Sequence, residues 1–232
     1  MKIAEIGLNH DGNFEQALRL MQIAKEYEYD LVKFQKRSAG KWFSDPTPRP
    51  DSPFGKTVGD HRHALEFTIG QHEILLKKAH SMGLKYGCSV WDPFAADEIF
   101  NLLGPGDILK VGRPSNSELD LLYVIRQLYL DTPEKTNCPL LVSCRNSTEA
   151  KLIKATFNSV NNLELYLLFC PGNYPDREKD LPNDLPDWAS GYSLHHTDPI
   201  FGNRLSGKII ERHIAIPQTK HRDKGWSIVY PN

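Results

Sequence analysis

The sequence predicts a parallel TIM-type (β/α)8 barrel that forms a single domain over residues 1–232. Three observations predict this fold. Short apolar segments typical of strands alternate with amphipathic segments typical of helices, as in parallel sheets. Eight such strand-like segments can be counted, the number that closes this kind of barrel. Polar side chains also stand at the C-terminal ends of these segments, where barrel enzymes place their ligand-binding groups.

The elements follow one another along the chain with recognisable helix boundaries. Asn13 and Ser147 are expected to be N-caps, and Gly83 is expected to end a helix. The expected strands are KIAEIG (2–7), DLVKFQ (30–35), LKYGCSV (84–90), DILKVG (107–112), PLLVSC (139–144), LELYLLFC (163–170), WASGYSL (188–194) and KIIERHIAI (208–216). The expected helices are Phe14–Tyr29, Gly70–Met82, Pro93–Leu103, Asn116–Tyr129 and Ser147–Asn158.

Two connections depart from the regular pattern. The segment Lys36–Thr68 is too long for an ordinary loop and is expected to form an arm or lid beside the active site. The segment Leu194–Ser206 is too short, and too interrupted by Pro199 and Gly202, to hold a full barrel helix. The helix ring is therefore expected to be incomplete near strands 7 and 8. Another subunit would cover the exposed flank, which predicts a homodimer or higher homo-oligomer.

Composition narrows the class of ligand. The formal net charge is −1, with acidic and basic residues mixed, so neither nucleic acid nor an anionic membrane is an expected partner. No apolar run approaches the roughly 20 residues of a membrane span, and the start lacks the pattern of a secretory signal. The four cysteines show no CxxC pair and are expected to be buried thiols in a reducing cytoplasm. A small-molecule substrate is therefore expected.

Two lysines in apolar strands predict an anionic ligand. Lys33 and Lys110 stand within expected strands, and a buried ammonium is costly unless an anion meets it. Arg113 and several strand-end hydroxyls would lie nearby, which makes phosphate the natural candidate. A serine at a strand end is more often a hydrogen-bonded filler than a ligand contact.

An acid and an imidazole in the last apolar strand predict a metal site. Glu211 and His213 are two residues apart and point to the same side of their strand, next to His195 on strand 7. Two histidines with carboxylates and waters suit Mn²⁺, with Mg²⁺ or Fe²⁺ as alternatives. The competing interpretation is a core histidine, with Glu211 paired to Arg212 or a lysine.

The ordered motifs resemble those of the sialic acid synthase family, the phosphoenolpyruvate-dependent N-acetylneuraminate, legionaminate and pseudaminate synthases. They are IAEIGLNHDG, VKFQ, DILKVG, CPGNYP, GYSLHHT and IIERH, with FGKTVGDHRHALEFT before the third strand. The resemblance spans nearly the whole chain and covers the barrel domain, without the family's C-terminal antifreeze-like domain. It implies a transferase that condenses phosphoenolpyruvate with the open-chain aldehyde of an acylated amino sugar. The products would be a nonulosonic acid and phosphate.

The resemblance also assigns roles. Metal ligands fall on His195 and His213. Phosphoenolpyruvate-binding groups fall on Lys33, Ser89, Lys110, Arg113, Ser143 and Ser193, and sugar-binding groups on Gln35, Tyr174 and Asp223. Glu5 and Glu211 are both candidates for the base that activates water, and the sequence does not choose between them.

Departures from the family pattern keep other functions open. Ser115 stands where a sugar-contacting glutamate is usual, and Leu194 replaces an aspartate before His195 and His196. A degenerate, non-catalytic binder of a sugar or phosphorylated ligand therefore remains an alternative. So does a barrel aldolase or lyase in which Lys33 or Lys110 forms a Schiff base.

Overall fold

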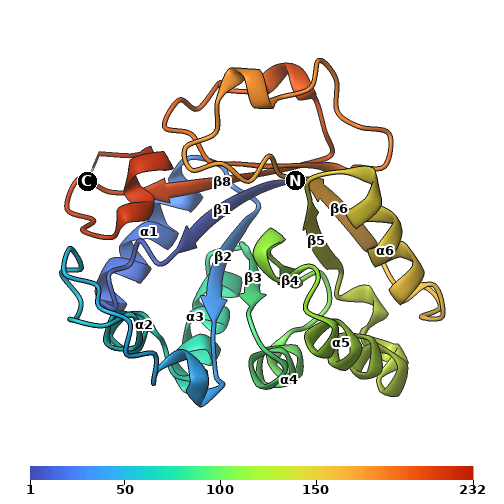
Figure 1. Cartoon of the computed structure of the whole chain (residues 1–232), viewed down its shortest axis with the longest axis horizontal. Coiled ribbons are helices and arrows are strands. Elements are labelled where there is room, and N and C mark those ends of the chain that lie inside the picture. Colours follow the sequence, from blue (N-terminus) through green and yellow to red (C-terminus); the bar gives the residue numbers. More distant parts are fainter. Residues whose placement is uncertain (232) are drawn as a thin grey trace.

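Eight parallel strands close into a barrel in the computed structural model, which describes residues 1–231. The strands pair in chain order, and β1 also pairs with β8, which closes the sheet (Figure 1). They are β1 Lys2–Gly7, β2 Leu31–Lys36, β3 Lys85–Val90, β4 Ile108–Val111, β5 Leu140–Cys144, β6 Leu165–Phe169, β7 Gly191–Leu194 and β8 Ile209–Ala215. The barrel predicted from the sequence is confirmed.

Helices cover the strands from β1 to β6. They are α1 Phe14–Glu26, α3 Ile69–Ser81, α4 Pro93–Leu102, α5 Leu119–Asp131 and α6 Ser147–Phe157. The cap expected at Asn13 is confirmed, because its Oδ1 accepts a hydrogen bond from the Gln16 amide at 3.0 Å. The cap expected at Ser147 is wrong by one residue. Asn146 caps α6 by accepting the amides of Thr148 and Glu149, each at 3.0 Å, since its longer side chain reaches both.

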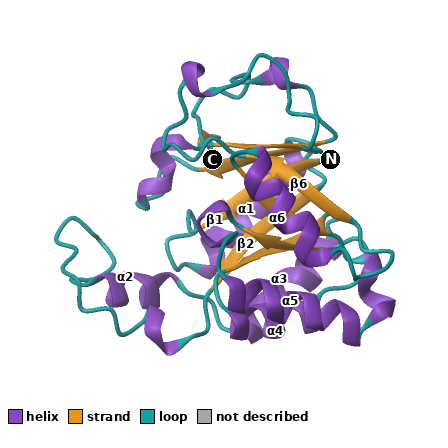
Figure 2. Ribbon diagram, turned by 45° about the vertical axis from the view of Figure 1, so that its right-hand side comes forward, coloured by secondary structure: helices purple, strands orange, loops and turns teal. Residues whose placement is uncertain are grey.

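Gly83 ends α3 as expected, with a φ of +74° that a side chain would disfavour. Two elements were not expected. Helix α2, Val58–Leu65, lies inside the Lys36–Thr68 arm and begins with a capping box between Thr57 and Asp60. A short strand β9, Ile228–Val229, extends the sheet beside β8. The arm and α2 stand out from the body of the barrel in Figure 2.

The helix ring is incomplete at β7 and β8, as predicted, because no α-helix among residues 1–231 connects β6 to β7 or β7 to β8; these connections hold only the short 3₁₀ helices Glu178–Asp180 and Asn203–Leu205. The expected exposure of that flank is wrong. The two long connections fold over the strands (Figure 1) and bury Leu181, Tyr192, Leu194 and Leu205 in a separate apolar cluster. The chain thus covers its own flank. A second subunit stays a prediction, which light scattering can check.

The inside of the barrel changes from apolar to polar along each strand. A layer of aliphatic side chains fills the end near the strand N-termini: Ile3, Leu31, Ile108, Leu141, Leu168 and Ile209. Residues two positions later face the same side, because side chains alternate along a strand. Those next residues include Glu5, Lys33, Lys110, Ser143 and Glu211, all of them buried. The polar groups therefore meet above a packed floor, at the C-terminal mouth.

The four cysteines are all buried free thiols, as the sequence predicted. Within residues 1–231, no helix combines the length and the apolar character needed to cross a bilayer.

Candidate active site

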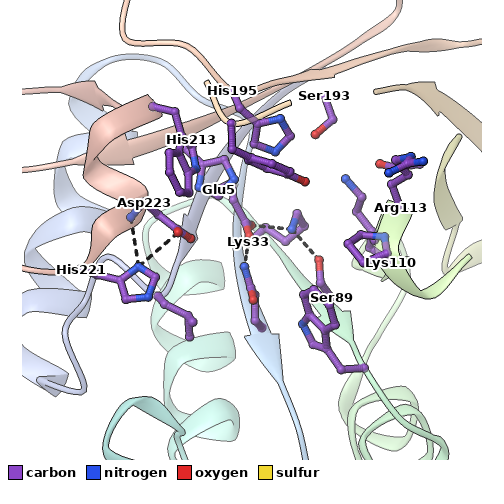
Figure 3. Close-up of a pocket in the computed structure, with 18 of the residues that line it drawn as sticks. Glu5, Lys33, Ser89, Lys110, Arg113, Ser193, His195, His213, His221 and Asp223 are labelled. Atoms are coloured by element: carbon purple, nitrogen blue, oxygen red, sulfur yellow. Dashed lines mark hydrogen bonds and ion pairs between the residues drawn. The ribbon is translucent and has the colours of Figure 1, made fainter. Parts of the chain in front are cut away.

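A cavity of about 590 Å³ opens at the C-terminal mouth of the barrel. Its volume falls within the range typical of small-molecule sites. Every residue assigned a site role from the sequence lines this cavity: Glu5, Lys33, Gln35, Ser89, Lys110, Arg113, Ser143, Tyr174, Ser193, His195, Glu211, His213 and Asp223. The structure therefore brings the whole predicted set together, and Figure 3 shows ten of the lining residues by label.

Lysines and glutamates form a compact charged cluster at the base of the cavity. Lys33 Nζ lies 2.5 Å from Glu5 Oε2 and 3.7 Å from Glu211 Oε2, and it donates to Ser89 Oγ at 2.6 Å. Lys110 Nζ donates to Glu211 Oε1 at 2.5 Å. Carboxylates from β1 and β8 thus compensate both ammonium groups, so the burial of these lysines does not by itself require the predicted anionic ligand.

The two glutamates differ in their surroundings. Glu211 accepts hydrogen bonds from Lys110 and, at 2.6 Å, from Ser193. Burial alone would raise its pKa, but the charges of Lys110 and Lys33 outweigh burial and lower it. Glu5 accepts from Gln35 Nε2 at 2.9 Å, and burial raises its pKa despite Lys33. Glu211 is thus the firmly ionised carboxylate, and Glu5 is the one more easily protonated.

Two histidines stand side by side above this cluster (Figure 3). The ring centroids of His195 and His213 are 5.0 Å apart, and the rings are tilted by 46°. Burial lowers the pKa of His213 well below its ordinary value, so its imidazole is neutral and has a free lone pair. His196 turns away and stacks on Phe201 at 4.0 Å, which agrees with His195 as the inward residue.

The donors present fit a metal ion bound through two imidazoles. The Nδ1 atoms of His195 and His213 are buried without a hydrogen-bond partner. Asp176 Oδ2 lies 3.5 Å from His195 Nδ1, so a carboxylate oxygen stands on the same side of the ring as this nitrogen. Among residues 1–231, no group of three or more His, Cys, Asp and Glu forms a complete ligand set. Water or substrate would therefore supply the remaining positions.

Arg113 reaches the cavity from the turn after β4. Its closest acid is Glu149, at 3.8 Å, and its buried Nε has no hydrogen-bond partner. Gly172 lies against the guanidinium, and a Cβ there would come within 2.9 Å of Arg113 Nη1. The φ of Gly172 is +81°, so glycine is favoured there by the backbone conformation as well as by the close approach of Arg113. The CPGNYP segment thus leaves room for Arg113 beside the cavity.

Several lining residues were not found from the sequence. They come mainly from the arm and from the 3₁₀ turn Arg222–Trp226: Arg37, Trp42, Arg49, His61, Arg62, His221, Arg222 and Trp226. Apart from Arg37, which directly follows β2, these residues do not stand at strand ends, so the pattern that marked the other site residues did not mark them. Counted over the whole lining, seven side chains are Lys or Arg and three are Asp or Glu. This surplus of basic groups favours anionic ligands.

The arm is tied to the barrel at its base by Glu66. Glu66 Oε1 accepts the Arg37 amide at 2.9 Å and lies 3.5 Å from Lys36 Nζ. Arg37 Nη2 in turn donates to Gln35 Oε1 at 3.2 Å, and Gln35 contacts Glu5. The two ends of the arm thus meet next to the charged cluster.

The protein is a parallel barrel whose cavity holds two neighbouring histidines and a surplus of basic side chains. Comparison with known sequences shows to which family such a protein belongs. A family model described as the NeuB family matches residues 20–229. The chain belongs to the NeuB family.

Curated relatives are similar in sequence, and a solved structure is similar in fold. N-acetylneuraminate-9-phosphate synthase from Homo sapiens is 29% identical over 94% of this chain, which covers 62% of that protein. N,N'-diacetyllegionaminic acid synthase from Legionella pneumophila is 24% identical over 94% of this chain and 64% of its own length. The chain thus spans less than two thirds of these relatives. The N-acetylneuraminic acid synthetase structure from Leptospira borgpetersenii has a TM-score of 0.77 at 19% identity, covering 97% of this chain and 77% of its own.

Proposed function

We propose that this protein joins phosphoenolpyruvate to the open-chain aldehyde of an acylated amino sugar, releasing a nonulosonic acid and phosphate. The observation that carries the proposal is one cavity that holds the His195–His213 pair directly above the Lys33, Lys110 and Glu5 cluster. Membership of the NeuB family supports the same reaction class.

The anionic substrate would bind over the charged cluster. Lys33, Lys110 and Arg113 supply positive charge, and the hydroxyls of Ser89, Ser143 and Ser193 line the same cavity. Phosphate and carboxylate would replace part of the contacts that the glutamates now make with the lysines. Once these contacts are exchanged, the lysines and hydroxyls would fix the enol face toward the aldehyde.

A divalent metal, Mn²⁺ in our proposal with Mg²⁺ or Fe²⁺ as alternatives, would be held by His195 and His213 and would supply Lewis acidity for the aldehyde. The sugar would lie near Gln35, Tyr174 and Asp223, which line the cavity.

Bond changes follow a simple order. The C3 carbon of phosphoenolpyruvate forms a bond to the aldehyde carbon, whose oxygen becomes a hydroxyl. Water adds to C2, and the C2–O bond to phosphate then breaks, leaving a 2-keto acid and inorganic phosphate. We assign the proton of the water to Glu5, since burial raises the pKa of Glu5 whereas the charges of Lys110 and Lys33 outweigh burial and lower the pKa of Glu211. Glu211 then acts as a positioning residue for the lysines.

Phosphate release tests the proposal. Purified protein with phosphoenolpyruvate and Mn²⁺ is assayed against a panel of acylated amino sugars and simple aldoses. We expect release with at least one amino sugar and none without an acceptor. The variant His213→Ala should abolish the metal-dependent release. Silence across the panel, with measurable ligand binding, would instead support the non-catalytic binder.

A Schiff-base aldolase is the second candidate, because burial lowers the pKa of Lys110 although Glu211 opposes the shift. Borohydride with substrate distinguishes the two. Trapping of substrate on Lys110 would favour the aldolase, whereas metal dependence and insensitivity to borohydride would favour the synthase.

A further inference from the structure

The acceptor of the proposed reaction is an open-chain aldehyde, whereas an acylated amino hexose in water is almost entirely a closed ring. In the closed ring, C1 is bonded to the ring oxygen and carries the anomeric hydroxyl. Opening the ring requires that a proton be delivered to the ring oxygen and another be removed from that hydroxyl. A single protonated carboxyl group can do both with its two oxygens, so such a group is expected beside the sugar.

Asp223 offers a carboxyl group of this kind. It lines the cavity from the 3₁₀ turn Arg222–Trp226, and its side chain is 13% exposed. Neither of its carboxyl oxygens accepts a hydrogen bond from any of residues 1–231, although His221 Nδ1 lies 3.4 Å from Oδ1. Glu5 and Glu211, in contrast, are held by lysines. Both oxygens of Asp223 are therefore free to meet a ligand.

Hydrogen bonds to the loop after β1 fix the position of this turn. Asp11 Oδ1 accepts the His221 amide at 2.9 Å. The Asp223 carbonyl accepts a hydrogen bond from Ser227 Oγ at 2.6 Å, and Asn9 Nδ2 donates to the same Ser227 Oγ at 2.9 Å. Asn9 and Asp11 belong to the IAEIGLNHDG motif, so part of that motif serves to position the Asp223 turn.

The imidazole of His221 favours a protonated Asp223. The Asp223 amide donates to His221 Nδ1 at 3.3 Å, so this nitrogen carries a lone pair and no proton. The same lone pair faces Asp223 Oδ1, and Figure 3 marks both contacts. Two lone pairs repel each other, whereas a proton on Oδ1 would lie between the two atoms. The geometry thus favours the acid form of Asp223.

The charged and titratable neighbours of Asp223 support the same conclusion. Burial is the main cause that raises the pKa of Asp223 to about 7, and the charge of Glu5 adds to the rise. Three arginines oppose it: Arg222, Arg37 and Arg49. Tyr174 and His221 are neutral, because burial raises the pKa of the first and lowers that of the second to about 3. A proton is therefore available on Asp223 near pH 7.

An aromatic wall connects Asp223 with the histidine pair. The Tyr174 ring lies 5.4 Å from the Trp226 ring and 4.3 Å from the His195 ring, measured between centroids. In Figure 3, Asp223 lies on the side of the cavity away from Lys110. A sugar packed on this wall would have C1 between Asp223 and the histidine pair, and its anion-binding partner would lie on the other side.

We propose that this protein also opens the ring of its acceptor, with Asp223 as the catalytic acid and base. The inference rests on the proposed function. One oxygen of protonated Asp223 gives its proton to the ring oxygen as the bond from C1 to that oxygen breaks, and the electron pair of the bond stays on the ring oxygen. The other oxygen takes the proton of the anomeric hydroxyl, whose electron pair forms the aldehyde carbonyl. Asp223 is then protonated on its second oxygen, and no other reactant is consumed.

Anomer exchange tests the inference, because opening and reclosing of the ring interconvert the two anomers. N-acetylmannosamine and N-acetylglucosamine, each freshly dissolved as one anomer, are followed by polarimetry with purified protein and Mn²⁺. The measurement is made with and without phospholactate, which has the phosphate and carboxylate of phosphoenolpyruvate but no nucleophilic carbon. We expect exchange faster than in buffer, and Asp223→Asn should lower the protein-dependent rate by roughly 100-fold or more.

Two further readouts distinguish an acid from a residue that only binds the sugar. The protein-dependent rate should fall as pH rises through about 7, because the ring oxygen takes its proton from the acid form of Asp223. Calorimetry should show that Asp223→Asn changes the affinity for the sugar far less than it changes the exchange rate, since asparagine can still form hydrogen bonds. Asp184→Asn is the control, because Asp184 is exposed and lies outside the cavity, and it should match wild type.

A sugar that binds without faster exchange in either condition would overturn the inference. So would faster exchange that persists in Asp223→Asn, or a rate that rises through pH 7. Phosphate release from phosphoenolpyruvate with the same sugars separates the two proposals. Faster exchange that depends on Asp223, with no phosphate release, means that the synthase proposal fails while ring opening stands. Phosphate release without faster exchange keeps the synthase and overturns ring opening, and binding of neither sugar overturns both.

Discussion

Replacing Glu211 by Gln removes one charge from the cluster at the base of the barrel and keeps its shape. The side chains of Glu211 and Lys110 are 4% and 3% exposed, and their charged atoms lie 2.5 Å apart. Glutamine can still accept from Lys110 and Ser193, so the loss is mainly one of charge. Glu5 remains 2.5 Å from Lys33, and the uncompensated charge therefore falls on Lys110.

Two limits can be set on the free energy of unfolding that the Glu211→Gln variant loses. Breaking a buried pair by removing one partner costs about 3–5 kcal/mol. Lys110 can escape by releasing its proton, and neutralising a lysine with an ordinary pKa near 10.4 costs about 5 kcal/mol at pH 7 and about 2 kcal/mol at pH 9. In the variant, the unfolded chain binds a proton that the folded chain has lost, so stability rises with pH. We expect a deficit of about 3–5 kcal/mol at pH 7 that shrinks to about 2 kcal/mol at pH 9.

Urea unfolding followed by circular dichroism at both pH values measures this deficit. Glu73→Gln is the control, because Glu73 and Lys77 form a 2.6 Å pair with side chains 49% and 70% exposed. Its loss should stay below about 0.5 kcal/mol. A deficit for Glu211→Gln below about 1 kcal/mol at pH 7, or one that does not change by pH 9, would refute the assignment of Glu211 as the counter-ion of Lys110.

Two further predictions concern the mouth of the barrel. His213→Ala should weaken Mn²⁺ binding, measured by calorimetry on metal-stripped protein, by roughly 100-fold or more, while exposed His63→Ala leaves it unchanged. Unaltered affinity would remove His213 from the metal site. Burial raises the pKa of Asp223 from 3.8 to about 7, so the folded chain holds a proton that the unfolded chain loses, and stability falls as pH rises between those values. Asp223→Asn should therefore be more stable than wild type at pH 8, by at most about 4 kcal/mol. Urea unfolding measures this gain, with the exposed Asp184→Asn as the control. A gain no larger than that of the control would contradict the raised pKa.

The barrel could be predicted because each strand carries its own signal. An apolar run predicts a strand, and the polar residues near its C-terminal end predict which side chains face the cavity. Lys33 and His213 were found in this way. Pairings between strands carry no such local signal. Lys110 and Glu211 are 101 residues apart, and only the closed barrel shows that they neutralise each other.

The arm shows why the rest of the site could not be predicted. Arg49 and Arg62 lie in a segment whose path is set by turns, by the α2 capping box and by contacts at its base, and no periodicity relates them to a strand. The same limit applies to the flank at β7, where irregular connections, rather than a helix or a partner, cover Tyr192 and Leu194.

Glu66 joins the two ends of the arm, so the arm leaves the barrel and returns to it at one place, and Ser38 and Trp42 also donate to Asp92 at the start of α4. The free-energy cost of closing a loop rises only slowly with its length, so such an arm can lengthen, shorten or change sequence while the strands keep their register. In the proposed reaction, variation in the arm would thus change the residues near the acceptor while the groups on the barrel strands stay constant. New specificities within this fold can arise by exchange of about thirty contiguous residues rather than by redesign of the barrel.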